Sequence, residues 1–211
     1  MKKTIIISCA GMGTRLGIGT TKALIDMDGK PLIGRQLESI PKEFDVRVVV
    51  GYQAEKVMEV VKQYRKEVTF AFNHDYKTTG TGASLSKGLI GAEEMIIALD
   101  GDLLVHPDDF KNFIENDEEC IAGCQPTTDN PVLMTINNNS EVVEFSRERG
   151  QLEWTGMAQI KRDRLLPGEG HVYQMLEGLL PIKVMEIRTK EVDTPNDYEQ
   201  ALQWVRNGYQ D

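Results

Sequence analysis

The first half of the sequence alternates short apolar runs with longer amphipathic segments, and this alternation constrains the fold more than any other feature. The runs at residues 4–9, 46–50, 68–72 and 95–99 are mostly β-branched or aliphatic, which is typical of strands. Segments with helical signals lie between them, at residues 31–40, 54–64 and 81–90. Such a strand–helix repeat predicts an α/β fold with a mostly parallel sheet covered on both faces.

The second half of the sequence has a different pattern, with several predicted strands in succession. After a helix predicted at 107–116, four strands are expected at 120–125, 132–136, 142–147 and 153–159. The Asn-rich turn at 137–140 indicates a hairpin connection. A helix at 172–179, a strand at 182–187 and a final helix started by Thr194-Pro195 close the chain. No linker, low-complexity tract or repeat interrupts it, so we expect one domain over residues 1–211: a Rossmann-like three-layer fold with a mixed sheet and a small β-rich insertion.

Charge and composition exclude several function classes. The net charge of -9 and pI near 5.0 argue against nucleic-acid binding and favour a small partner. Residues 1–30 depart from this average, because five basic side chains face two acidic ones there, so a local phosphate site is plausible. No apolar run approaches a membrane span or a signal-peptide core, and we expect a cytoplasmic protein without a membrane partner. The three cysteines show no zinc-ligand spacing and are expected to be buried free thiols.

A glycine-rich loop follows the first strand directly, at residues 10–17. Glycines at a strand end allow backbone N–H groups to approach phosphate oxygens. A dinucleotide-binding site is a poor match, since the third glycine comes one residue late and the second strand ends in Val50-Gly51-Tyr52, without the ribose-binding acid expected there. A P-loop is excluded because Lys22 comes too late. In the remaining interpretation, Arg15 and Lys22 flank the loop and together grip a triphosphate.

This stretch resembles the signature of the sugar nucleotidyltransferases, GxGTR followed by a Pro-Lys pair. Arg15 and Lys22 match that signature, whereas Thr21 stands in the position of the proline. The proline would preset the backbone angle φ, so its replacement predicts a loop that is more mobile or differently bent.

Three further matches follow in the family's order. Residues 79–84 resemble the Gly-Thr-Gly element that borders the nucleobase in the uridylyltransferases. Asp100-Gly101-Asp102 resembles the family's Gly-Asp metal site, and residues 191–198 resemble the acidic C-terminal segment of the cytidylyltransferases and phosphocholine cytidylyltransferases. The resemblance is tight at 4–30 and 78–104, moderate at 188–203 and loose in the region between.

The resemblance implies a nucleotidylyltransferase that transfers NMP from an NTP, CTP or UTP, to a sugar 1-phosphate or a phosphorylated alcohol such as phosphocholine, releasing pyrophosphate. Residues 1–118 would form the nucleotide-binding half, and 119–211 the acceptor-binding and closing half. Arg15, Lys22 and Asp102 would be catalytic, and Mg²⁺ would be held by Asp102 and Asp193. The nucleotide would be bound by Ala10, Gly11, Met12, Gly13, Thr14, Gly80, Thr81 and Ser84.

Other interpretations remain open for several of these residues. Asp102 could cap a turn, and Asp193 could add only helix-dipole charge beside an N-cap formed by Thr194. Trp154 could line an acceptor pocket or belong to the core, while residues 147–149 are interpreted as a solvated hairpin end. A non-catalytic nucleotide-sensing domain and a molybdenum-cofactor nucleotidylyltransferase are the alternative functions. The acceptor and the oligomeric state are not determined by the sequence.

Overall fold

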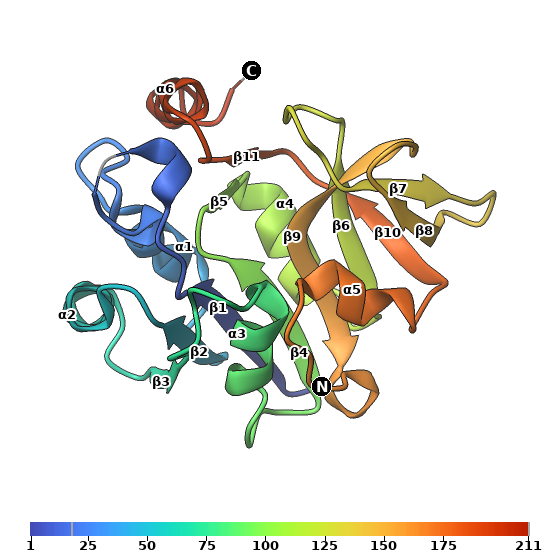
Figure 1. Cartoon of the computed structure of the whole chain (residues 1–211), viewed down its shortest axis with the longest axis horizontal. Coiled ribbons are helices and arrows are strands. Elements are labelled where there is room, and N and C mark those ends of the chain that lie inside the picture. The colour runs from blue at the N-terminus through green and yellow to red at the C-terminus, as the bar shows by residue number, and fades with distance from the viewer. Residues whose placement is uncertain (18, 211) are drawn as a thin grey trace.

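The chain, in a computed structural model, is described over residues 1–17 and 19–210, without the side chain of Arg15. Four parallel strands form the first half of a nine-stranded sheet: β1 (Lys3–Cys9), β2 (Asp45–Val50), β3 (Thr69–Phe72) and β4 (Met95–Asp100). The sheet has the order β3-β2-β1-β4-β9-β6-β10-β8-β7, and β1 lies left of centre in Figure 1. The expected α/β class is confirmed.

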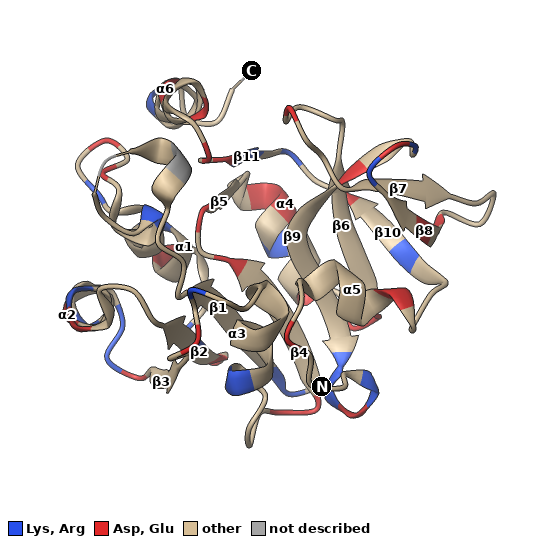
Figure 2. Cartoon of the chain, in the orientation of Figure 1, with Lys and Arg blue, Asp and Glu red and all other residues tan. Residues whose placement is uncertain are grey.

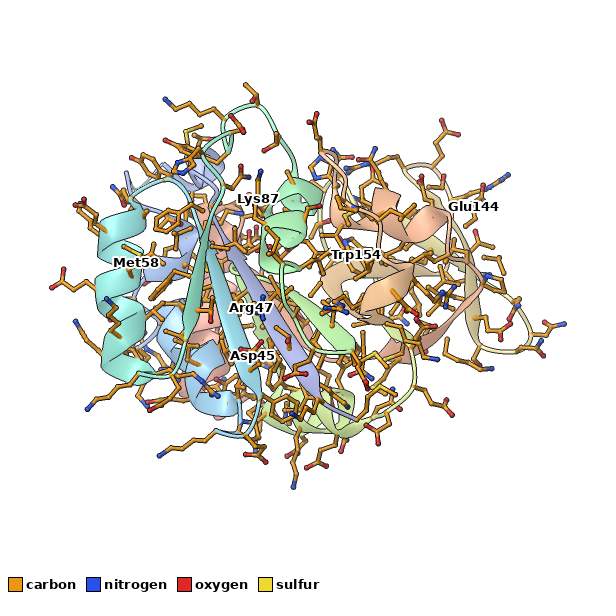
Figure 3. All side chains as sticks on the ribbon, turned by 90° about the horizontal axis from the view of Figure 1, so that it is seen from below. Asp45, Arg47, Met58, Lys87, Glu144 and Trp154 are labelled. Carbon is orange, nitrogen blue, oxygen red and sulfur yellow. The ribbon has the colours of Figure 1, made fainter. Side chains whose placement is uncertain are left out.

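The second half continues the same sheet with β6 (Cys120–Cys124), β7 (Leu133–Ile136), β8 (Glu141–Ser146), β9 (Leu152–Lys161) and β10 (Ile182–Glu186). Pairing is antiparallel here except between β6 and β10, so the sheet as a whole is mixed. In the view of Figure 3, Trp154 lies in this second half, away from Met58 on the outer helix of the first half.

Helices cover both faces of the sheet because neighbouring residues of a buried strand point to opposite sides. On one face, Ile5 and Ile7 pack against α1 (Leu32–Ser39), α2 (Ala54–Tyr64) and α4 (Pro107–Glu115). On the other, Ile6 packs against α3 (Thr81–Gly88) and α5 (Val172–Glu177). A third apolar cluster joins α6 (Pro195–Arg206) to the loops that follow β1. The result is three layers with the sheet in the middle.

Two strands of three residues each were not predicted. β5 (Leu103–Val105) pairs antiparallel with β11 (Thr189–Glu191), with Leu103 opposite Glu191. The backbone N–H of Val192 then donates to the carbonyl of Asp102 over 3.1 Å. This small sheet carries the C-terminal segment to the carboxyl end of β4, and Figure 2 shows acidic residues on both sides of it.

Two other expectations can be compared with the structure. All three cysteines are free; Cys9 and Cys120 are buried and Cys124 is half-buried. Among the helices of the described residues, none has the length and apolar character needed to cross a membrane.

Candidate active site

The glycine loop leaves the end of β1 and folds back over Lys22. Gly13 has a positive φ of 62°, and a Cβ there would come within 3.0 Å of the Cγ of Lys22. Glycine is therefore required both for the turn and for this close approach. The N–H of Tyr52, just after β2, donates to the carbonyl of Ala10 over 3.0 Å and fixes the start of the loop. Two 3₁₀ turns follow, at Thr14–Leu16 and Lys22–Leu24.

Thr21 takes the backbone angles that a proline would impose. Its φ is -67° and its ψ 143°, which lie within proline's range, and the side chain is buried. The loop therefore enters its second 3₁₀ turn with a proline-compatible φ, although the ring itself is missing.

A large cavity opens at the carboxyl ends of β1 and β4, where ligands bind in open α/β sheets. Its volume is about 810 Å³, within the range of small-molecule sites. The predicted nucleotide-binding residues line it except Met12: Ala10, Gly11, Gly13, Thr14, Gly80, Thr81 and Ser84. Lys22, Asp102 and Asp193 line it as well. Arg15 belongs to the first 3₁₀ turn, and its side chain lies outside the described part of the structure.

Lys22 links two carboxylates, one from the middle of the chain and one from its C-terminal part. Its Nζ donates to Oδ2 of Asp102 over 2.7 Å and forms a second, very short contact with Oδ1 of Asp193. The three side chains are 12%, 21% and 12% exposed, so solvent screens these pairs only partly. Burial alone would lower the pKa of Lys22, but Asp102 and Asp193 outweigh it and raise that pKa. The ammonium is therefore charged at neutral pH.

Glu191 joins the two aspartates in a compact acidic cluster. One oxygen from each of Asp102, Glu191 and Asp193 lies within 4.8 Å of the others. Burial, followed by the charges of Asp102 and Asp193, raises the pKa of Glu191 to about 8. Asp100 stands beside the cluster, and burial together with Asp102 and Glu191 raises its pKa as well.

The cluster has the donor chemistry that a hard divalent cation requires. Each of the three side chains offers a carboxylate oxygen in a partly buried region, and the Lys22 ammonium contacts two of them. Mg²⁺ prefers carboxylate oxygens and usually retains water, and the adjoining cavity has room for both water and phosphate. Asp102 and Asp193, the two ligands expected from the sequence, are thus brought together, and Glu191 is a third candidate.

The start of α6 shows both a helix cap, formed by Thr194, and the ion pair of the preceding Asp193 with Lys22. The Oγ1 of Thr194 accepts from the N–H of Asp197 over 3.2 Å, and Oδ2 of Asp197 accepts from the N–H of Thr194 over 2.8 Å. This capping box fixes the helix entry without using the side chain of Asp193. The capping box and the contact between Asp193 and Lys22 are therefore compatible.

The Gly-Thr-Gly element at the start of α3 is fastened to a loop from the second half of the chain. The N–H of Gly80 donates to the carbonyl of Glu169, and that of Gly82 to the carbonyl of Gly170, each over 2.8 Å. A Cβ at Gly80 would lie 2.4 Å from the Gly170 oxygen, so glycine is needed for this contact. Ser84, buried one turn further, accepts from Nδ2 of Asn73 over 3.1 Å. The backbone donors of both glycines are thus used within the protein.

The cavity is also lined by residues that the sequence did not assign to the site. The carboxylate of buried Glu153 accepts from the N–H of Thr127 over 2.8 Å and also binds the N–H and hydroxyl of Thr128. Arg147 lines the cavity and donates to the carbonyl of Asn130 over 2.7 Å. Residues 147–149 are exposed, as expected for a solvated hairpin end. These residues carry no motif, and their only signal was their place in the predicted acceptor-binding half, residues 119–211.

Trp154 lines the cavity and also packs against the apolar core on one face of the sheet, so it combines the pocket and core interpretations. Its ring packs edge-on against Phe145, with centroids 6.1 Å apart and planes at 87°. Tyr173 contacts the same phenylalanine at 5.7 Å and lines the cavity too. Trp154 and Tyr173 therefore form an aromatic wall of the cavity. The individual roles of all these residues stay predictions.

Comparison with known proteins supports the resemblance seen in the sequence. The chain is 32% identical over 114 residues to the bifunctional protein GlmU of Aliarcobacter butzleri, covering 53% of this chain and 26% of that protein. The chain thus spans about a quarter of the length of such curated relatives.

Two solved structures share the fold over nearly their whole length. The CTP:phosphocholine cytidylyltransferase LicC of Streptococcus pneumoniae is 21% identical with a TM-score of 0.78, covering 97% of this chain and 100% of that one. The inositol-1-phosphate CTP transferase of T. maritima is 19% identical with a TM-score of 0.77, covering 100% and 98%. Residues 5–161, most of the chain, match the model of the MobA-like NTP transferase domain. The chain belongs to this family of nucleotidyltransferases, enzymes that transfer phosphorus-containing groups.

Proposed function

We propose that this protein transfers the NMP group of CTP or UTP to a small phosphorylated acceptor, a sugar 1-phosphate or a phosphorylated alcohol such as phosphocholine, and releases pyrophosphate. Among the proteins with similar folds, one is named for CTP and phosphocholine and another for CTP and inositol 1-phosphate. A nucleoside triphosphate and a second phosphorylated molecule would need a roomy site, and the cavity of about 810 Å³ has the size for such a pair.

The observation that carries the proposal is the meeting of Lys22, Asp102 and Asp193 beside the glycine loop. The loop supplies backbone donors for phosphate oxygens, the lysine supplies a positive charge, and the carboxylates can hold a divalent cation. No serine, cysteine or histidine nucleophile is needed, because the acceptor's own phosphate oxygen is the nucleophile.

In the proposed reaction an oxygen of the acceptor phosphate attacks the α-phosphorus of the NTP. A new P–O bond forms to the acceptor, the bond between the α-phosphorus and the bridging oxygen breaks, and the electron pair leaves with pyrophosphate. The contribution of the protein is to align the two substrates and to stabilise the charge that develops. Lys22 would contact the α-phosphate, and Arg15 would hold the departing pyrophosphate.

Mg²⁺, held by Asp102 and Asp193 with Glu191 nearby, would neutralise phosphate charge. Ser84, Thr81 and the first residues of the glycine loop would bind the nucleoside part. The aromatic wall of Trp154 and Tyr173, together with the loop that Glu153 holds, would surround the acceptor beyond its phosphate.

The test is a pyrophosphate-release assay with Mg²⁺, crossing the four common NTPs against sugar 1-phosphates, phosphocholine and related phosphoalcohols. The expected result is release with one pyrimidine NTP and one acceptor, which is lost in Lys22→Ala and Asp102→Ala. Binding of an NTP without release across a broad acceptor panel would favour the non-catalytic sensing domain. Absence of both binding and release would refute the nucleotide site.

A further inference from the structure

The Lys22 ammonium contacts the same carboxylates that are predicted to bind the metal ion. It contacts Oδ2 of Asp102 and Oδ1 of Asp193 at the same time. These two aspartates, together with Glu191, form the cluster whose oxygens lie within 4.8 Å of one another. The lysine is thus already bound to the side chains that a divalent ion would need.

We propose that Lys22 is an internal competitor of the divalent cation: it holds Asp102 and Asp193 in the free protein, and the metal binds tightly only when nucleotide phosphate draws the ammonium away. The proposal rests on the proposed function, because it takes Asp102 and Asp193 as the metal ligands. It assigns Lys22 a second task, which is to couple metal binding to nucleotide binding.

Electrostatics support the competition. A divalent ion on these carboxylates would lie next to the Lys22 ammonium, and like charges repel strongly in a partly buried site. Only 12% of the Lys22 side chain is exposed, so water cannot easily screen that repulsion. The second oxygen of each carboxylate does not remove the conflict, because the repulsion acts whichever oxygen the metal binds.

The Lys22 side chain lies close to the glycine loop, where a second anionic partner could bind its ammonium. Gly13 lies against the Cγ of Lys22, so the side chain runs along the glycine loop before it reaches the aspartates. Phosphate bound at that loop would offer the ammonium a new anionic partner within the same cavity. The phosphate would release the carboxylates, and the two ligands would each favour the binding of the other, as reciprocal coupling requires.

The experiment measures Mn²⁺ binding to the nucleotide-free protein from the loss of the free Mn²⁺ paramagnetic resonance signal. The expected result is that Lys22→Met binds Mn²⁺ at least about tenfold more tightly than the wild type, which corresponds to about 1.4 kcal/mol. The gain should vanish when Asp102→Asn is added, because the site then loses a ligand.

Lys190→Met is the matched control. Lys190 lines the same cavity, and the ammonium that contacts Asp102 and Asp193 is that of Lys22, so Lys190→Met removes the same charge without removing that contact. Equal tightening by Lys190→Met would show a general charge effect and overturn the proposal. So would unchanged or weaker Mn²⁺ binding by Lys22→Met.

A second measurement covers the case in which Lys22→Met folds poorly. Lys22→Gln keeps a neutral polar group, and its melting temperature should rise more with added Mg²⁺ than that of the wild type; an equal rise would contradict competition. Failure of the proposed function is distinguishable, because it would appear as absent pyrophosphate release by the wild type, whatever the metal affinities are.

Discussion

Gly156 is a position where the structure predicts a large effect from one added methyl group. It lies in β9 with a positive φ of 84°, and a Cβ there would come within 2.5 Å of Oδ2 of Asp100. Gly156→Ala therefore combines two penalties. An L-residue in a left-handed conformation costs about 1–2 kcal/mol, and forcing an extra carbon into a packed site costs about 1–3 kcal/mol.

The sum is about 2–5 kcal/mol of unfolding free energy. For a chain of this length each kcal/mol lowers the melting temperature by about 2–4 °C, so a central value of about 3 kcal/mol predicts a fall of about 6–12 °C. Calorimetry and urea unfolding measure it. The added methyl group should also displace Asp100, which is two residues from Asp102. Pyrophosphate release should therefore fall by more than the loss of folded protein explains.

Gly91→Ala separates the two penalties. Gly91 has a similar φ of 69°, but nothing lies within 4 Å of the Cβ that would be added. It should therefore show only the conformational cost, about 1–2 kcal/mol. If the two variants lose equal stability, the contact with Asp100 carries no steric cost and the reasoning fails.

Three other predictions follow from the site and its supports. Lys22→Ala should lower turnover about a hundredfold or more, since a preorganised charge of this kind contributes about 3 kcal/mol, whereas Lys30→Ala, at an exposed pair with Glu38, should not; steady-state kinetics decides. Thr21→Pro should stabilise the fold by about 0.4–1 kcal/mol, because φ already suits proline, and a lower melting temperature would show that the loop does not accept the ring. Thr194→Ala should cost about 0.5–2 kcal/mol by removing the cap of α6, and an unchanged urea midpoint would contradict that role.

The secondary structure could be predicted because most elements are long enough to show their period. The helix expected at 54–64 is α2 with the same limits, and the strands expected at 4–9 and 95–99 differ from β1 and β4 by one residue at one end. β5 and β11 could not be found, since three residues contain no readable alternation. Their pairing depends on contacts between segments about 85 residues apart along the chain, such as the bond from Thr189 Oγ1 to the Leu104 carbonyl.

The sequence by itself determined the glycine loop, the basic residues that flank it and the Asp-Gly-Asp turn after β4, because these features depend on neighbours in the chain. Only the tertiary structure decided that Lys22 meets both Asp102 and Asp193, which are 80 and 171 residues away from it. The unpredicted β5–β11 pair makes that meeting possible. The acceptor side was likewise decided by packing, since a buried carboxylate such as Glu153 is recognised only from the donors that surround it.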